Sequence, residues 1–267
     1  MAHGSLFSFA LATLFAVSVA VASYRLRLLT LRGSLAQCAA GWVLFAFGGC
    51  QWVVPIVLFF VLSGVLTRLT GAASRPGADL FAKGETRDEL QVTANGGLAS
   101  LLVVPWFLTG VDLYYIAYLG AVGAAAADTW ATEIGMTSTR PPRSIRTLAA
   151  ASPGESGAIT PRGLLAAAAG GIVIALSASP WLGLQLAALG AVAGGAFAAT
   201  LVDSVLGATL QIQYRCTRCG RKTERPGHCG VASRRWRGYP CITNDAVNLL
   251  ASSSGAGLAV ALVLAWR

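Results

Sequence analysis

The sequence predicts an all-α polytopic membrane protein with about eight transmembrane helices and a small cytoplasmic zinc-knuckle loop. Composition is the first observation behind this prediction: 55% of the residues are hydrophobic and 12% are charged, whereas ordinary soluble domains are about 25% charged. The mean hydropathy of +0.64 agrees with it. The other two observations are recurring apolar runs and the placement of basic residues between them. We expect one membrane domain over residues 1–267, with a zinc-knuckle insertion at 212–243.

The apolar runs have about the length that a helix needs to cross the hydrocarbon core of a bilayer, roughly 17 to 25 residues. Polar or basic connections separate them, so each run is interpreted as one transmembrane helix. In chain order, the expected spans are 5–23, 34–49, 51–69, 95–110, 113–134, 163–179, 181–203 and 245–265.

Basic residues occur almost only in alternate connections. Those after the first, third, fifth and seventh spans hold three, four, four and eight Lys or Arg, including Lys83 and counting Arg68 at the end of the third span with the connection that follows it. Together these are 19 of the chain's 20 basic residues. The remaining one is Arg267. Because Lys and Arg accumulate in short cytoplasmic loops, these connections are expected in the cytoplasm and both termini outside. The same bias explains the net charge of +9, so we expect no nucleic acid partner.

Several polar side chains are expected at the cytoplasmic ends of different spans. Asp128 lies near the end of the fifth span, Asp203 closes the seventh, and Asp245 opens the eighth. Gln91 and Asn95 open the fourth span at the same surface. A charged group inside a bilayer costs at least ~2.5 kcal/mol on insertion scales. This convergence therefore predicts a functional site on the cytoplasmic face.

Helix capping is the alternative interpretation for part of this set. Asn95 and Asn244 can cap helices, and Asp245 in a first turn complements the helix dipole. Capping does not suit Asp128 or Asp203, because both are expected at helix C-terminal ends, where the dipole disfavours an anion. Glu133 follows Asp128 by five residues, about 140° around a helix, so these two carboxylates need not share one ion.

The chemistry of these side chains favours magnesium and phosphate. Carboxylates beside asparagines are hard oxygen ligands, which suit Mg²⁺ held partly through the phosphates of a substrate. The connection after the fifth span adds three arginines, Arg140, Arg143 and Arg146, and the turn SPGESG at 152–157. Backbone amides of such a turn can face phosphate oxygens. Metal, arginines and amide donors together indicate phosphoryl chemistry.

The stretch RCTRCGRKTERPGHCG contains Cys216 and Cys219 with two residues between them, followed by His228 and Cys229. This spacing is typical of a small structural zinc site with thiolate and imidazole ligands. A cytoplasmic loop lies in a reducing environment, which argues against disulfides. Cys241 is an alternative to His228 as the fourth ligand.

Six motifs occur in order between about residues 25 and 260: QVTANGG, ADTWATEIG, PRSIRT, PGESGA, LVDSVLGATLQ and NDAVNLLAS. They resemble the integral membrane family first catalogued as domain of unknown function 92, the transmembrane protein 19 and phytyl-phosphate kinase family. The resemblance implies a kinase that converts an isoprenoid monophosphate, such as phytyl phosphate, to its diphosphate. The implied donor is CTP or another nucleoside triphosphate, and the isoprenoid tail would lie between the helices, with membrane lipid as a further partner.

The resemblance also implies roles for individual residues. Asp128, Asp203 and Asp245 would hold Mg²⁺, with Glu133 as a further catalytic carboxylate. The residues assigned to substrate or phosphate are Gln91, Asn95, Arg143, Arg146, Gly154, Ser156, Gly157, Asn244 and Asn248. Two other function classes stay open: another membrane phosphotransferase, of the prenol kinase or cytidylyltransferase type, and an ion-coupled transporter. The prenyl chain, the donor base and the oligomeric state do not follow from the sequence.

Overall fold

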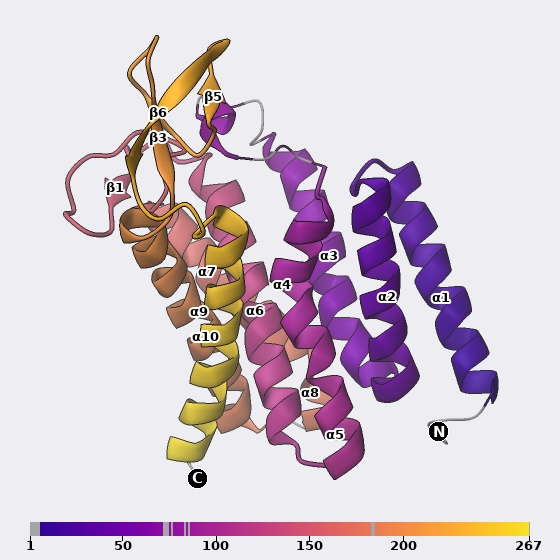
Figure 1. The fold of residues 1–267 in the computed structure, drawn as a ribbon. Coiled ribbons are helices and arrows are strands. Elements are labelled where there is room, and N and C mark those ends of the chain that lie inside the picture. Colours follow the sequence, from indigo (N-terminus) through magenta and orange to yellow (C-terminus); the bar gives the residue numbers. More distant parts are fainter. Residues whose placement is uncertain are drawn as a thin grey trace.

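The computed structural model describes residues 6–71, 75, 77–82, 84, 86–182 and 185–266. Lys83 and Arg267, which enter the count of basic residues, lie outside these described residues. Helices make up most of the described chain, and a small antiparallel sheet stands at one end of the helix bundle (Figure 1).

Each predicted span coincides with helical structure, and the fourth span is divided at Leu102 into two helices. A short 3-10 helix also occurs at Ala78–Leu80. The α-helices are α1 (Leu6–Arg25), α2 (Leu31–Gly48), α3 (Cys50–Thr70), α4 (Glu89–Leu101), α5 (Val103–Thr109), α6 (Leu113–Gly135), α7 (Pro161–Ser177), α8 (Ser179–Leu182), α9 (Leu186–Thr209) and α10 (Asn244–Ala265).

The count of eight spans is only partly supported. Within the described residues, five helical stretches are long and apolar enough to cross a membrane: α1, α3, α4 together with α5, α9 and α10. The shorter apolar helix α7 has 17 residues. Helix α6 is buried continuously from Tyr115 to Ala127 by other helices. Its side chains there contact protein and not lipid, so the helix does not need the high hydropathy of a lipid-facing helix.

Side-chain caps determine where several helices begin. Thr30, Thr160 and Thr243 each accept a hydrogen bond from the backbone N–H three residues later. Asp88 and Gln91 form a reciprocal capping box at the start of α4. These bonds satisfy N–H groups that have no partner inside a helix. The helix starts near the cavity described below are therefore well defined.

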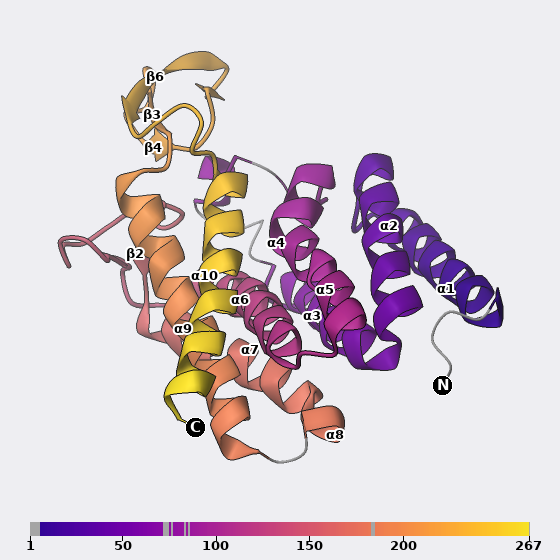
Figure 2. The ribbon, with the colours of Figure 1, turned by 60° about the horizontal axis from the view of Figure 1, so that its bottom comes forward.

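Helix α6 lies in the middle of the bundle and packs against α7, α9 and α10 (Figure 2). Its contact with α10 is backbone to backbone, since a Cβ on Gly120 would lie 2.4 Å from the Gly255 carbonyl oxygen. Small residues permit such close approach between membrane helices. Toward the start of α6, the ring of Trp52 packs 5.2 Å from Tyr115 and 4.6 Å from Tyr118.

The insertion at 212–243 forms an antiparallel sheet, which corrects the all-α prediction. Its strands are β3 (Gln213–Cys216), β4 (Lys222–Thr223), β5 (Gly227–His228) and β6 (Val231–Arg237), in the spatial order β4-β3-β6-β5. We call it the cysteine sheet. A second pair, β1 (Arg143–Ser144) and β2 (Ala158–Ile159), joins the two ends of the connection between α6 and α7. Most of these strands are only two to four residues long, too short for a recognisable alternation of polar and apolar residues.

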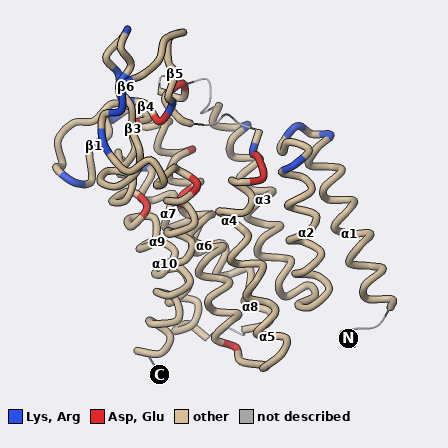
Figure 3. Tube along the Cα trace, in the orientation of Figure 1, with Lys and Arg blue, Asp and Glu red and all other residues tan. Residues whose placement is uncertain are grey.

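The two ends of the bundle differ in charge. Lys and Arg gather at the end that carries the cysteine sheet (Figure 3). Helix α1 begins and helix α10 ends at the opposite end (Figure 1). This arrangement agrees with the alternation of basic connections in the sequence. Which end faces the cytoplasm stays a prediction.

Candidate active site

A cavity of about 530 Å³ lies where the helix bundle meets the cysteine sheet. Its walls come from α3, α4, α6, α7, α9 and α10, together with the turn at 152–157 and the segment 77–82. Most of the predicted site residues line this one cavity: Gln91, Asn95, Asp128, Glu133, Gly154, Ser156, Gly157, Asp203, Asn244 and Asn248.

Asp128 of α6 and Asp203 of α9 form the acidic part of the cavity. Asp203 interacts electrostatically with Asp128, and both interact with Glu224. Among the described residues, the buried Oδ2 of Asp203 has no hydrogen-bond partner. A divalent cation would neutralise such an oxygen among like charges. Because α9 continues to Thr209, Asp203 lies inside the helix and not at its end, which corrects the predicted span.

Glu224 follows β4 in the cysteine sheet, and the sequence analysis missed it. Its Oε1 accepts hydrogen bonds from Ser156 Oγ at 2.8 Å and from Gln211 Nε2 at 2.7 Å. Its Oε2 accepts one from the backbone N–H of Ala82 at 2.9 Å. One carboxylate thus joins the turn at 152–157, the residues after α9 and the segment 77–82. No motif or spacing in the sequence connects Glu224 with the helices. The one signal in the sequence is that Glu224 is an acidic residue within a basic stretch.

The turn at 152–157 is packed closely against its neighbours. Gly157 has a φ of +76°, and a Cβ there would lie 2.6 Å from a backbone oxygen of α9, so only glycine fits without strain. On the other side, Lys222 of the cysteine sheet forms an ion pair with Glu155 at 2.6 Å. The turn is therefore held between α9 and the cysteine sheet at the wall of the cavity.

Glu133 belongs to a different part of the cavity from the two aspartates. Its carboxylate oxygens accept hydrogen bonds from Thr67 at 2.7 Å and from Thr70 at 3.1 Å, both in α3. Arg87, just before α4, also lines the cavity. Burial lowers the pKa of the Arg87 guanidinium, and the nearby Glu133 carboxylate opposes that shift. Glu133 is thus turned toward α3 and Arg87, as its rotation from Asp128 along α6 suggests.

The arginines that line the cavity are not the predicted pair. Arg143 donates a hydrogen bond to the Leu148 carbonyl of its own loop at 2.8 Å, and Arg146 is exposed. Neither lines the cavity, because the pairing of β1 with β2 closes this loop into a hairpin beside it. The arginines that do line it are Arg87, Arg140 and Arg225.

Asp245 also lies outside the cavity lining. It occupies the first turn of α10, whose N-cap is Thr243, and there its charge complements the helix dipole. Asn244 and Asn248 of the same helix do line the cavity. Helix capping, the alternative interpretation for Asn244 and Asn95, applies to neither residue. Asn244 follows the N-cap residue of α10, and Asn95 lies inside α4.

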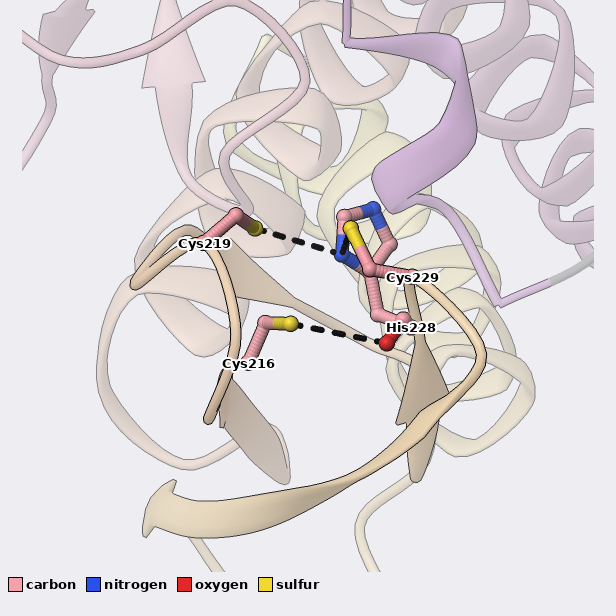
Figure 4. Close-up of side chains that lie close together, drawn as sticks. All are labelled: Cys216, Cys219, His228 and Cys229. Carbon is pink, nitrogen blue, oxygen red and sulfur yellow. Dashed lines mark hydrogen bonds between the residues drawn. The ribbon is translucent and has the colours of Figure 1, made fainter.

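Four side chains of the cysteine sheet turn toward one another (Figure 4). The possible metal-binding atoms of Cys216, Cys219, His228 and Cys229 all lie within 4.8 Å of one another. Nδ1 of His228 is 3.5 Å from Cys219 Sγ and 3.2 Å from Cys229 Sγ. A hydrogen bond from the Cys219 backbone lowers the pKa of the Cys216 thiol to about 6. Of the two candidates for the fourth position, His228 joins this cluster and Cys241 does not.

Asp79 connects the cysteine cluster with the cavity. Its Oδ2 lies 2.8 Å from His228 Nε2 and 3.1 Å from an Arg221 nitrogen. The hydrogen bond raises the pKa of His228 to about 9 and lowers the pKa of Asp79. A carboxylate on the outer nitrogen is a common way to orient a metal-binding histidine. Because Asp79 also lines the cavity, the two sites share one residue.

Comparison of the sequence with known proteins identifies the family of this chain. The family model described as Integral membrane protein DUF92 matches residues 14–256. Protein PGR of Arabidopsis thaliana is 28% identical over 257 residues, which cover 87% of this chain and 88% of the plant protein. An uncharacterized membrane protein of Methanocaldococcus jannaschii is 30% identical over 185 residues, 69% of this chain and 76% of that protein. No solved structure matches the chain. Because the family model covers most of its length, this protein belongs to the DUF92 family of integral membrane proteins.

Proposed function

We propose that this protein is a membrane kinase that transfers a phosphoryl group from a nucleoside triphosphate, CTP being the first candidate, to an isoprenoid monophosphate such as phytyl phosphate. The observation that carries the proposal is a single cavity that holds Asp128, the orphan oxygen of Asp203 and three arginines. Carboxylates for a cation and arginines for phosphate suit a metal-bound polyphosphate. The end of a helix bundle is also where a lipid tail and a soluble nucleotide can meet.

Asp128 and Asp203 are the residues that would hold Mg²⁺, with Asn244 and Asn248, which line the same cavity, as neutral oxygen donors. The fit rests on the buried Oδ2 of Asp203, which lacks a donor among the described residues. Bound magnesium would neutralise charge on the transferring phosphoryl group. Asp245 is not part of this set, because it does not line the cavity.

The side chains of the cavity would position and neutralise the substrates. Arg140 and Arg225 line the cavity together with Ser156, where they can contact phosphate oxygens. In the transfer, an oxygen of the acceptor monophosphate attacks the terminal phosphorus of the donor. The bond to the bridging oxygen breaks and the nucleoside diphosphate leaves. Because the acceptor is already an anion, positioning matters more than a strong general base.

A structural zinc ion is a second part of the proposal. Three thiols and one imidazole, those of Cys216, Cys219, Cys229 and His228, form a known tetrahedral zinc set, and their ligand atoms are close enough together to share one ion. Four protein ligands leave no coordination position for a substrate. The ion would therefore stabilise the cysteine sheet and take no part in phosphoryl transfer.

The test of the kinase proposal is phosphoryl transfer by the purified full-length protein in detergent with Mg²⁺. Labelled CTP, ATP, GTP or UTP is combined with phytyl, geranylgeranyl or farnesyl monophosphate, and prenyl diphosphate is measured. We expect product with at least one donor. Asp203→Asn should lower kcat about a hundredfold or more, because it removes charge from the proposed metal site.

The matched control is Asp112→Asn. Asp112 is exposed and immediately precedes α6, at the end of this helix remote from Asp128, so the same chemical change there should leave kcat near the wild-type value. Equal activity of the two variants would contradict the metal assignment. Absence of diphosphate from the wild type with every donor would contradict the kinase. Assays with free prenols, with phosphatidate, and of ion-driven uptake into vesicles would then test the other function classes.

A further inference from the structure

Arg87 lines the cavity, and its position is fixed on several sides. Its backbone N–H donates to the Leu28 carbonyl at 3.1 Å, and its carbonyl accepts from the Thr30 N–H at 3.0 Å. Its guanidinium carbon lies 5.9 Å from the centre of the Phe59 ring in α3. Arg87 thus lines the cavity with its backbone held by two hydrogen bonds and its guanidinium held against Phe59, which is the preorganisation expected of a binding residue.

In the part of the chain that the structure describes, the positive charge of Arg87 has no direct ion pair. Among the described residues, no carboxylate oxygen lies within 4.0 Å of an Arg87 nitrogen. Glu133 acts on it electrostatically without a direct ion pair, and the two Glu133 oxygens accept hydrogen bonds from Thr67 and Thr70. An enclosed charge without a close partner is costly. An anionic ligand in the cavity would remove that cost.

The surroundings of Arg87 bear on whether the anionic ligand is the lipid acceptor or the nucleotide donor. Figures 1 and 2 place α2 and α3 on the opposite side of α6 from α9 and the cysteine sheet. Helix α3 exposes Val61, Val65 and Leu69, which recur every four residues and so form one apolar stripe. This stripe faces out of the bundle, as a lipid-facing surface does, and ends near Thr70. A lipid can approach along this stripe, and a soluble nucleotide can approach from the polar cysteine sheet on the other side.

We propose that Arg87 binds the phosphate of the lipid acceptor and not the phosphates of the nucleotide. This inference rests on the proposed kinase function and adds a separate subsite to it. Arg87 and Glu133 then form the acceptor side of the cavity, and Asp128 and Asp203 form the donor and metal side. A guanidinium can donate two parallel hydrogen bonds to a phosphate, which would hold the acceptor oxygen toward the donor.

The experiment compares Arg87→Gln, Arg87→Lys and the control Arg32→Gln in the full-length protein in detergent. Arg32 lies near Arg87 in the fold but its side chain is 82% exposed and pairs with Glu89 at the surface. Arg87→Gln should raise KM for farnesyl monophosphate about tenfold or more, with KM for the nucleotide changed less than about threefold. Arg87→Lys keeps the charge but loses the planar fork, so it should show a smaller change in the same direction. If Arg87→Gln does not fold, the lysine variant provides the test.

A binding assay separates this inference from the kinase proposal. Farnesyl monophosphate should raise the Tm of the wild type, while farnesol and an equal concentration of inorganic phosphate should not, and Arg87→Gln should lose the shift. That result supports the acceptor subsite even if no transfer is detected. Three results would overturn it: a nucleotide KM that rises in place of the acceptor KM, equal stabilisation by inorganic phosphate, or no stabilisation of the wild type by farnesyl monophosphate.

Discussion

Three hydrogen bonds converge on the carboxylate of Glu224 at the edge of the cavity. The donors are Ser156, Gln211 and the Ala82 backbone, so the residue organises segments that are far apart in the chain. Hydrogen bonds to a charged group contribute about 1.5 to 3 kcal/mol each. At the residue scale, Glu224 is a positioning residue for the turn at 152–157 and a source of negative charge beside Asp203.

Glu224→Gln should reduce both the order of the turn and transfer activity. An amide offers one acceptor oxygen where the carboxylate offers two, so its NH₂ group would face a donor. We expect transfer to fall about tenfold or more, together with a lower Tm and a higher KM for the nucleotide. The control is Glu89→Gln, whose carboxylate pairs with Arg32 at 3.7 Å on the surface and should matter little. Equal behaviour of the two variants would show that the hydrogen bonds of Glu224 have no such role.

The cysteine sheet borders the cavity at one end of the bundle, where Glu224 and Arg225 belong to the lining. Thr223 and Glu224 both bond the Leu80 carbonyl, at 2.9 Å each, and Asp79 bonds His228. The segment 77–82 is therefore attached to the sheet beside the proposed zinc ligands. At the scale of elements, folding of the sheet and the shape of the cavity are coupled.

Cys216→Ser should release zinc and destabilise the protein. Cys216 is a buried member of the ligand cluster, and the loss of one thiolate weakens a structural zinc site strongly. We expect less zinc by elemental analysis and a lower Tm, with activity lost as the sheet unfolds. Cys241→Ser, outside the cluster, should keep both values. Purified wild-type protein without zinc, or a zinc loss of equal size in Cys241→Ser, would contradict the assignment.

The whole molecule is polarised along the bundle. Basic residues and the cysteine sheet share one end, and the start of α1 and the end of α10 share the other (Figures 1 and 3). The cavity, which Glu224 and Arg225 help to line, lies at the end that carries the sheet. The positive-inside bias predicts that the sheet end is cytoplasmic. A nucleotide would then reach the cavity from the cytosol, while the helices remain in the lipid.

Reporter fusions in bacterial membranes test this orientation. Green fluorescent protein fused after Ser138, in the connection between α6 and α7, should fluoresce, because it would stay in the cytoplasm. The same reporter fused to the C-terminus should remain dark, and alkaline phosphatase there should be active. The opposite pattern at both positions would show an inverted protein, and equal fluorescence at both would contradict the arrangement of the spans.

Much of the fold could be predicted because bilayer constraints act on short stretches of sequence. Apolar length marks the helices, and the bias of Lys and Arg marks the loops, so the positions of the helices and the polarity of the bundle followed from local patterns. The convergence of Asp128, Asp203 and Asn95 also followed, since each lies in the half of its span nearer the cysteine sheet, although Asp203 and Asn95 lie inside their helices and not at the ends. The β-structure was missed because its strands are too short to show a pattern.

The sequence by itself thus determined the membrane class, the helices and the end of the bundle at which polar side chains gather. Tertiary structure alone decided which of these side chains share the cavity. Arg87 and Glu224 line the cavity although the sequence analysis did not assign them to the site. Arg143, Arg146 and Asp245 were assigned to the site but do not line the cavity. The physical reason is that side-chain direction depends on helix rotation, on the β1–β2 hairpin and on the docking of the cysteine sheet. These are set by packing between distant segments, and no local spacing records them.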